Sequence, residues 1–310
     1  MNRGRPAARP AARPARTAVA LVATLLSVAA FTLVGCTERS TTSTATSSTT
    51  TTLPALQGAF AGPTTGRLLD AAQPLRVTLF GDSLAYDAAP AIRANLTSTG
   101  VVAVAEWHIA GYGFGPGPGY LPEGFDWKEM LVRGTAETRP EVVVTSFGLV
   151  DTLNIMQGRY TPEAFDVSLR EALELLTVGD TKVLLLGIPP TVADAGRPTQ
   201  TIVEGPLNSI MRAVVANYPG EVEYMDLDRV LSDSGRPVYE FAGRRVRKLD
   251  LTHFCPDGAA LLAVAIHDTL ARSWPIPASA AGWSLGDWRA DARYDDPSCT
   301  VGRTWPGIGT

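Results

Sequence analysis

Short apolar runs alternate with longer amphipathic stretches from residue 75 onward, and this alternation limits the fold class of the chain. The expected strands are 76–80, 101–107, 141–147, 182–188 and 221–226. The expected helices are 88–98, 127–138, 161–176, 205–216 and 256–272. Several strands are apolar without interruption, as in Val142-Val143-Val144, which is typical of strands buried on both faces. The pattern therefore predicts an α/β domain with a parallel sheet between two layers of helices.

The first 67 residues are expected to lie outside that domain. Residues 1–35 join an arginine-rich start to an apolar run, which is the pattern of a secretory signal. The run ends in Leu33-Val34-Gly35-Cys36, which resembles the bacterial lipobox, so Cys36 is predicted to carry lipid and to hold an extracytoplasmic protein on the cell membrane. A transmembrane anchor is the alternative, because the apolar run is almost long enough to span a bilayer. Residues 36–67 are rich in Ser and Thr and are predicted to be a disordered tether.

Charge and cysteine content narrow the range of partners. Removing residues 1–35 takes away five of the 27 basic residues and none of the 31 acidic ones, which leaves a net charge of −9. A protein this acidic is not expected to bind nucleic acid or anionic lipid through its overall field. Cys255 and Cys299 are predicted to form a disulfide in an oxidising compartment, the alternative being two free, buried thiols. These two cysteines and the three histidines show no ligand spacing, so no metal site is predicted.

Two short blocks carry residues suited to nucleophilic chemistry. Gly81-Asp82-Ser83-Leu84 directly follows the first expected strand, and a serine at such a turn exposes its hydroxyl at the carboxyl edge of the sheet. Asp250-Leu251-Thr252-His253 precedes the last expected helix, and Asp250 is close enough to bind the His253 imidazole and fix its tautomer. A serine, a base and an orienting carboxylate make ester chemistry the leading interpretation. The alternatives are a serine that only caps a helix and a buried, structural histidine.

Together the two blocks resemble those of the GDSL/SGNH hydrolase family, and the resemblance covers about residues 75–272. It implies a flavodoxin-like, three-layer α/β/α sandwich whose five-stranded parallel sheet has the order 2-1-3-4-5. It also implies a serine ester hydrolase that needs no metal or organic cofactor. In that scheme Ser83 attacks the ester carbonyl, His253 is the base, and Asp250 orients His253.

The two middle blocks of the family match less well. The family has a glycine after the second strand whose N–H donates to the oxyanion, and alignment on the strand end selects Gly113, with Gly111 as the second choice. After the third strand the family usually has Gly-x-Asn-Asp, whereas this chain has Gly-Leu-Val-Asp at 148–151. Val150 thus replaces the asparagine that would be the third oxyanion donor. Loss of one such donor typically costs about 2.7–4 kcal/mol of transition-state stabilisation.

Three explanations for Val150 stay open. Asn154, in the next turn, could supply the missing amide. The backbone N–H groups of Ser83 and Gly113 could be sufficient without it. The chain could instead belong with the SGNH-like domains of envelope O-acyltransferases, whose third block also tends to lack the asparagine.

The segment 237–248 is predicted to be a hairpin that turns at Ala242-Gly243. Its basic residues are Arg244, Arg245, Arg247 and Lys248. They are interpreted either as part of a solvated strand or as an anchor for an anionic group of the substrate.

The chain is thus expected to contain a lipoprotein signal (1–35), a tether (36–67), an SGNH hydrolase-like domain (68–277) and a C-terminal extension rich in Trp, Gly and Pro that packs on the domain (278–310). We expect a monomeric, lipid-anchored serine esterase that uses a Ser-His-Asp triad to hydrolyse acyl esters, namely O-acetyl or short acyl groups on envelope glycans or lipids. The alternatives are an O-acyltransferase for cell-envelope glycans and a non-catalytic glycan-binding domain with the same fold.

Overall fold

The computed structural model describes residues 60, 67–115, 124–192, 201–202, 206–228, 230–232 and 235–300. The predicted signal, the lipidation site Cys36 and nearly all of the tether lie outside these residues, as does the end of the C-terminal extension. Their boundaries therefore stay predictions. Within the described ranges, no helix combines the length and the apolar character that a membrane span requires.

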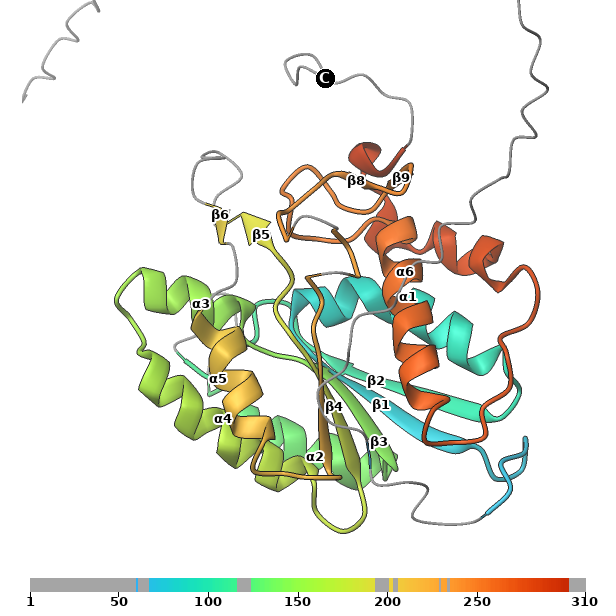
Figure 1. Cartoon of the computed structure of the whole chain (residues 1–310), viewed down its shortest axis with the longest axis horizontal. Coiled ribbons are helices and arrows are strands. Elements are labelled where there is room, and N and C mark those ends of the chain that lie inside the picture. Colours follow the sequence, from blue (N-terminus) through green and yellow to red (C-terminus); the bar gives the residue numbers. More distant parts are fainter. Residues whose placement is uncertain are drawn as a thin grey trace, which may run out of the picture. The chain divides into compact units, whose positions relative to one another are not determined.

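The centre of the fold is a five-stranded sheet (Figure 1). Its strands are β1 (Leu75–Gly81), β2 (Val102–His108), β3 (Val142–Ser146), β4 (Lys182–Leu186) and β7 (Val222–Met225). The order is β2-β1-β3-β4-β7, and every neighbouring pair is parallel. The predicted flavodoxin-like order is therefore confirmed. Because Gly81 pairs with Ser146, the carboxyl ends of β1 and β3 lie side by side.

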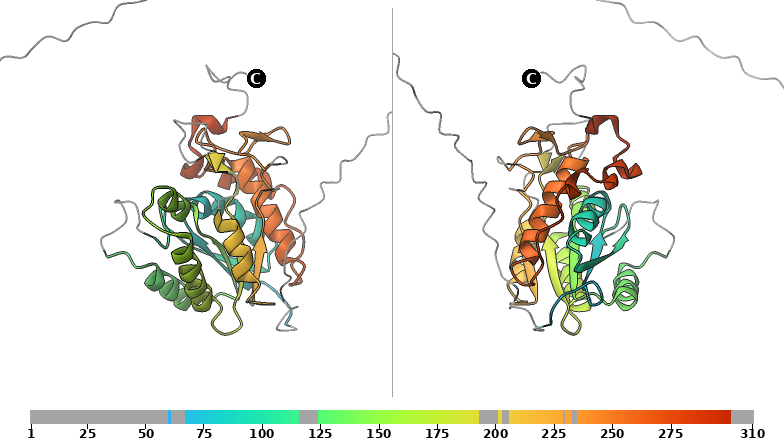
Figure 2. Two further views of the ribbon diagram at one scale, coloured as in Figure 1. Left: turned by 60° about the vertical axis from the view of Figure 1, so that its left-hand side comes forward. Right: turned by 90° about the vertical axis from the view of Figure 1, so that its right-hand side faces the viewer.

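Helices cover both faces of the sheet (Figure 2). The helices of one face are α1 (Ser83–Thr97) and α6 (Pro256–Leu270). Those of the other face are α2 (Trp127–Thr138), α4 (Pro162–Leu176) and α5 (Pro206–Val215). Strand side chains alternate between the two cores, so that Val144 contributes to the α1/α6 core and Val143 to the other. Both faces are buried, as the uninterrupted apolar strands predict.

Local sequence explains where the helices begin. Thr161 caps α4 by accepting a hydrogen bond from the Ala164 N–H at 3.1 Å, and a proline takes the first helical position, as expected. α1 begins at Ser83 rather than at the expected residue 88, because the Asp82 carboxylate caps it. The short helix α3 (Leu149–Met156) was not expected, since its N-cap is a glycine that makes no side-chain hydrogen bond.

Two small hairpins and the C-terminal extension complete the described fold. The hairpins pair β5 (Thr191–Val192) with β6 (Thr201–Ile202) and β8 (Glu240–Phe241) with β9 (Arg244–Arg245). The second hairpin turns at Ala242 and Gly243, with φ values of 50° and 72°, as its sequence predicts. The 3-10 helices of the extension are Trp283–Leu285, Asp287–Ala290, Ala292–Tyr294 and Pro297–Cys299. Trp283 and Trp288 pack against the α1/α6 core.

Candidate active site

The turn between β1 and α1 presents Ser83. Gly81 ends the strand with a φ of 145°, and a Cβ atom there would collide with the Ser146 carbonyl oxygen, so this position requires glycine. The Asp82 N–H donates to the same oxygen at 3.4 Å, and the Asp82 carboxylate accepts from the Leu84 N–H at 2.9 Å. Ser83 therefore takes the first position of α1, where its N–H has no partner within the helix and the helix dipole favours negative charge.

His253 lies 170 positions after Ser83 in the chain, yet its Nε2 atom is 2.8 Å from Ser83 Oγ. Its Nδ1 atom is 2.6 Å from Asp250 Oδ2. The other Asp250 oxygen accepts hydrogen bonds from the backbone N–H groups of Thr252 and His253, both at 2.9 Å. The structure thus brings Ser83, His253 and Asp250 into one hydrogen-bonded chain.

Asp250 and His253 stabilise each other's charge. Burial alone would raise the pKa of Asp250, but the hydrogen bonds from the His253 ring and backbone outweigh it and lower that pKa to about 2. Burial alone would lower the pKa of His253, but the nearby Asp250 carboxylate outweighs it and raises that pKa above its ordinary value. A proton on Nδ1, held by the ionised carboxylate, leaves Nε2 as the acceptor that faces the serine hydroxyl.

The base loop, residues 246–255, is attached to α1 through Asp87. Asp87 Oδ2 accepts hydrogen bonds from the Phe254 N–H at 3.1 Å and from Lys248 Nζ at 2.9 Å. The Asp87–Lys248 pair is largely buried. Asp87 lies four residues after Ser83, and this i, i+4 spacing, which puts both on one side of α1, is the signal that could have identified it from the sequence.

The C-terminal extension holds the base loop from another side. Cys255 and Cys299 form the predicted disulfide. The Leu249 N–H also donates to Ser298 Oγ at 3.2 Å. The loop that carries His253 is therefore fastened both to α1 and to the extension.

A cleft of about 430 Å³ opens beside Ser83. Its polar residues are Ser83, Asp250, Thr252 and His253, and its remaining residues are Ala110, Gly111, Leu149, Val150, Leu153 and Val192. This volume is within the range of sites that bind small molecules. In the part of the chain that the structure describes, no group of three or more His, Cys, Asp or Glu side chains could hold a metal ion.

The cleft wall contains Gly111 but neither Gly113 nor Asn154. Gly113 lies against α3, because a Cβ atom there would be 3.1 Å from Val150 Cβ and 3.1 Å from a carboxylate oxygen of Asp151. Asn154 is buried. The cleft therefore does not support Gly113 and Asn154 as the oxyanion donors, and it favours the second choice, Gly111.

Two buried carboxyl groups lie near this wall. Asp151 Oδ1 accepts a hydrogen bond from the Gly115 N–H at 2.7 Å, which ties the loop after β2 to α3. Burial raises the pKa of Asp151 to about 6 and that of Asp82 to about 7. The sequence does not predict a role for either carboxyl group, because neither their burial nor their contacts are visible in a local pattern.

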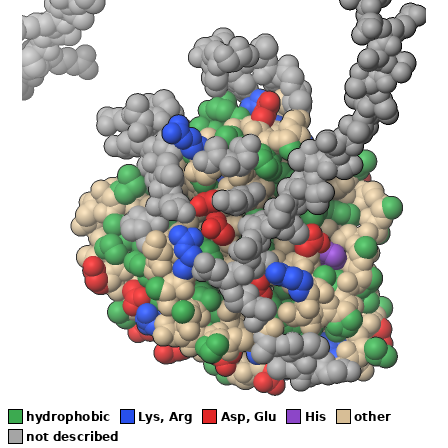
Figure 3. Space-filling model, viewed as in Figure 1, with side chains coloured by type: hydrophobic (Ala, Val, Ile, Leu, Met, Phe, Trp, Pro, Cys, Tyr) green, Lys and Arg blue, Asp and Glu red, His purple; other side chains and the backbone are tan. Residues whose placement is uncertain are grey.

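The basic cluster in the second hairpin is used largely within the fold. Arg245 donates to Glu240 at 3.0 Å, and the buried Arg247 donates to the Thr252 carbonyl oxygen at 2.6 Å. Lys248 is bound to α1 as described above. Neither the solvated strand nor the anion anchor therefore describes these three residues. On the face shown in Figure 3, basic and acidic side chains of the described residues are interspersed.

Comparison with solved structures finds similar chains of low sequence identity. An aryl esterase from M. smegmatis is 19% identical, with 64% of this chain and 99% of that chain covered and a TM-score of 0.46. A carbohydrate acetylesterase from Sinorhizobium meliloti is 16% identical, with 64% and 99% covered and a TM-score of 0.49. A GDSL-like lipase from Bacteroides thetaiotaomicron is 15% identical, with 64% and 89% covered and a TM-score of 0.46. No curated protein matches the sequence.

A family model settles the membership of the chain. The model described as "Protein of unknown function (DUF459)" matches residues 76–269, which is more than half of the chain. DUF459 is an SGNH-like family, so the predicted resemblance to GDSL/SGNH hydrolases is confirmed. The matched residues include Ser83, His253 and Asp250. The chain therefore belongs to the DUF459 family and has the SGNH hydrolase fold.

Proposed function

We propose that this protein is a serine esterase that uses Ser83, His253 and Asp250 as a catalytic triad. One observation carries the proposal: the unbroken chain of hydrogen bonds from Asp250 through His253 to the Ser83 hydroxyl, at 2.6 and 2.8 Å. These distances are within the reach that a nucleophile, a base and an orienting group require. The chain of hydrogen bonds also borders a cleft large enough for a small ester.

In the first half of the reaction Ser83 Oγ attacks the acyl carbonyl carbon while its proton passes to His253 Nε2. The tetrahedral intermediate collapses when the bond between the carbonyl carbon and the alcohol oxygen breaks. His253 gives its proton to the departing alcohol, and the acyl group remains on Ser83. In the second half, water gives a proton to His253 and attacks the carbonyl carbon of the acyl-enzyme. The bond between that carbon and Ser83 Oγ then breaks, the carboxylic acid leaves, and His253 returns its proton to Ser83 Oγ.

Asp250 acts through His253. Its low pKa keeps it ionised at neutral pH, so it stabilises the imidazolium that forms in each half of the reaction. The Ser83 N–H at the start of α1 and the Gly111 N–H in the cleft wall are the proposed donors to the oxyanion. Val150 offers no third donor, so turnover is expected to be modest for an esterase of this type.

The substrate class follows from the expected location. A lipid on Cys36 and the Ser/Thr-rich tether would hold the domain outside the cytoplasm, close to the envelope. We therefore propose O-acyl esters of envelope glycans or lipids as substrates. Transfer of the acyl group to a sugar hydroxyl instead of water is the second candidate, because this chain has Val150 where SGNH-like acyltransferase domains also tend to lack the asparagine of the third block.

A fluorophosphonate probe tests the proposed function. The exported wild-type protein should be labelled, and labelling should vanish in Ser83→Ala but persist in Ser284→Ala, which removes a hydroxyl in the extension. A folded wild type that stays unlabelled and cleaves no ester would instead favour a binding domain without turnover. Adding a sugar acceptor to an acetyl-ester assay separates the two chemistries, since product partitioning changes only if transfer occurs.

A further inference from the structure

We infer that α3 forms an acyl-binding wall that selects an apolar acyl group longer than acetyl. The inference rests on the proposed esterase function and names the acyl class that the site accepts. Three apolar residues of this helix, Leu149, Val150 and Leu153, line the cleft beside Ser83.

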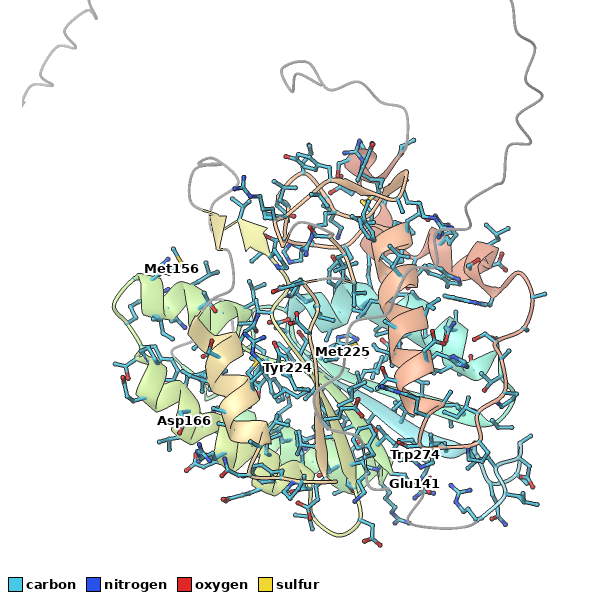
Figure 4. All side chains as sticks on the ribbon, in the orientation of Figure 1. Glu141, Met156, Asp166, Tyr224, Met225 and Trp274 are labelled. Atoms are coloured by element: carbon cyan, nitrogen blue, oxygen red, sulfur yellow. A yellow bond between two sulfur atoms is a disulfide. The ribbon has the colours of Figure 1, made fainter. Side chains whose placement is uncertain are left out.

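These side chains form a continuous stripe. Positions 149, 150 and 153 follow the i, i+1, i+4 spacing of an apolar helix face. Met156 continues the stripe one turn further, stands out from the end of α3 in Figure 4, and is 52% exposed. The helical spacing therefore continues the apolar face of α3 from the cleft lining to the exposed Met156.

The wall is held firmly in place. The Gly148 carbonyl oxygen accepts hydrogen bonds from both the N–H and the Oγ1 of Thr152, each at 2.8 Å. On another side of the helix, Asp151 accepts from the Gly115 N–H at 2.7 Å. Leu149 is itself buried in the α1/α6 core. Because this surface is already ordered, little conformational entropy is lost there when a ligand binds.

The chemistry of the reaction assigns the acyl group, rather than the alcohol, to this wall. His253 must return its proton to the departing alcohol oxygen, so the alcohol lies on the His253 side of the carbonyl carbon. The other large apolar residue of the cleft, Val192, belongs to that side, because its carbonyl oxygen accepts from Thr252 Oγ1 at 3.3 Å. The α3 stripe is the apolar surface that remains for the acyl substituent.

Val150 determines the preference. An asparagine here would present an amide to the acyl chain, whereas valine presents two methyl groups. Each methylene group that leaves water for such a surface changes kcat/KM by about fourfold. An acetyl group contains no methylene group, so it gains least from the wall.

The test compares kcat/KM for p-nitrophenyl acetate, butyrate and hexanoate with the mature, exported protein. We expect butyrate to exceed acetate by about fifteenfold and hexanoate not to fall below butyrate. Val150→Asn and, independently, Leu153→Asn should each lower the butyrate-to-acetate ratio about fivefold or more. Val167→Asn, which makes the same change at a 56% exposed valine of α4, should leave the ratio unchanged. Thermal unfolding confirms that the variants are folded.

The outcomes separate the acyl wall from the esterase function itself. A wild type that cleaves acetate best, or variants that keep the wild-type ratio, would overturn the acyl wall and leave the esterase standing. A second series keeps the acetyl group and lengthens the alcohol. If Val150→Asn alters that series instead, α3 binds the alcohol and the inference is wrong. If the protein cleaves none of these esters and the probe does not label Ser83, both proposals are overturned.

Discussion

Ser83 Oγ and His253 Nε2 are 2.8 Å apart, but the two residues are held in place by different kinds of contact. The nucleophile turn, residues 81–84, is held by the cap of its own helix and by the neighbouring strand of the sheet. The base loop is held by residues far away in the chain. Phe254 reaches back 167 positions to Asp87, and Cys255 reaches forward 44 positions to Cys299.

The two halves of the candidate site therefore depend on different parts of the protein. The nucleophile turn needs only β1, β3 and α1 to be folded, because its contacts are with the central sheet and with its own helix. The base loop also needs the C-terminal extension and the Asp87–Lys248 pair. Local opening should therefore begin in the base loop rather than at Ser83.

The largest effect is expected within the base loop itself. In Asp250→Asn the amide oxygen can still accept from the Thr252 and His253 N–H groups, but the imidazole loses the carboxylate that orients it. We expect kcat for p-nitrophenyl butyrate to fall about 10⁴-fold, measured by steady-state kinetics. The control is Asp287→Asn, an exposed carboxylate of the extension. A fall of less than tenfold would mean that Asp250 does not orient the base.

The same variant has a second readout in its pH profile. The base acts in its neutral form, so wild-type activity falls as the pH drops through the pKa of His253. Because Asp250 raises that pKa, its removal should move the acid limb of kcat/KM to lower pH. An unmoved acid limb would contradict the contact between the carboxylate and the ring.

The next largest effect concerns the disulfide that joins the base loop to the extension. Cys255 and Cys299 are 44 positions apart, so their joint replacement by alanine should lower the free energy of unfolding by about 4 kcal/mol, measured by denaturant titration. Below the unfolding transition, hydrogen exchange should speed up in residues 246–255 more than in residues 81–84. Reduced wild type serves as the control and should behave like the double variant. If hydrogen exchange speeds up equally in residues 246–255 and 81–84, the base loop does not depend on the extension more than the nucleophile turn does.

The smallest effect at acidic pH is expected in the nucleophile turn. Asparagine caps a helix about as well as aspartate, so Asp82→Asn should change stability at pH 4 by no more than about 0.5 kcal/mol. The folded-state pKa of about 7 lies above the value of about 3.9 in the unfolded chain. The stabilising contribution of Asp82 is therefore complete below about pH 4 and is lost as the pH rises through 7.

Asp82→Asn should remove this loss, so the variant should gain stability relative to wild type between pH 4 and pH 8. Chemical denaturation at both pH values measures the gain. Asp126→Asn is the matched control, since it changes an exposed N-cap carboxylate whose oxygen accepts from the Lys128 N–H at 2.8 Å. If both variants show the same pH dependence, burial of Asp82 is not its cause.

The sheet and most helices could be predicted because each depends on a periodic pattern along the chain. The strand of Val142–Val144 and the helix that follows Thr161 are examples. α3 was not predicted because it has only eight residues and its N-cap, Gly148, has a φ of 105° and makes no side-chain hydrogen bond. The apolar pattern does not extend to the first turn of α1, since that turn depends on the hydrogen bond between the Asp82 carboxylate and the Leu84 N–H.

The candidate site was predicted in part for the same reason. Ser83, His253 and Asp250 lie in blocks short enough to be visible as local patterns. The choice between Gly111 and Gly113 could not be made in that way, because it depends on neighbours brought in by the fold: a Cβ atom at Gly113 would meet Val150 and Asp151 of α3. Nothing in the order of residues states which of two nearby glycines faces the cleft.

Three features followed from the sequence without the structure. They are the parallel α/β class, the order of the strands through the family resemblance, and the candidate catalytic residues Ser83, His253 and Asp250. Each depends on side chains close together in the chain, where periodicity and spacing act directly. The tertiary structure alone decided that Asp87 and the extension hold the base loop, and that α3 lines the cleft with Leu149, Val150 and Leu153. Such contacts join distant segments, and only the packing of the whole core brings those segments within reach of each other.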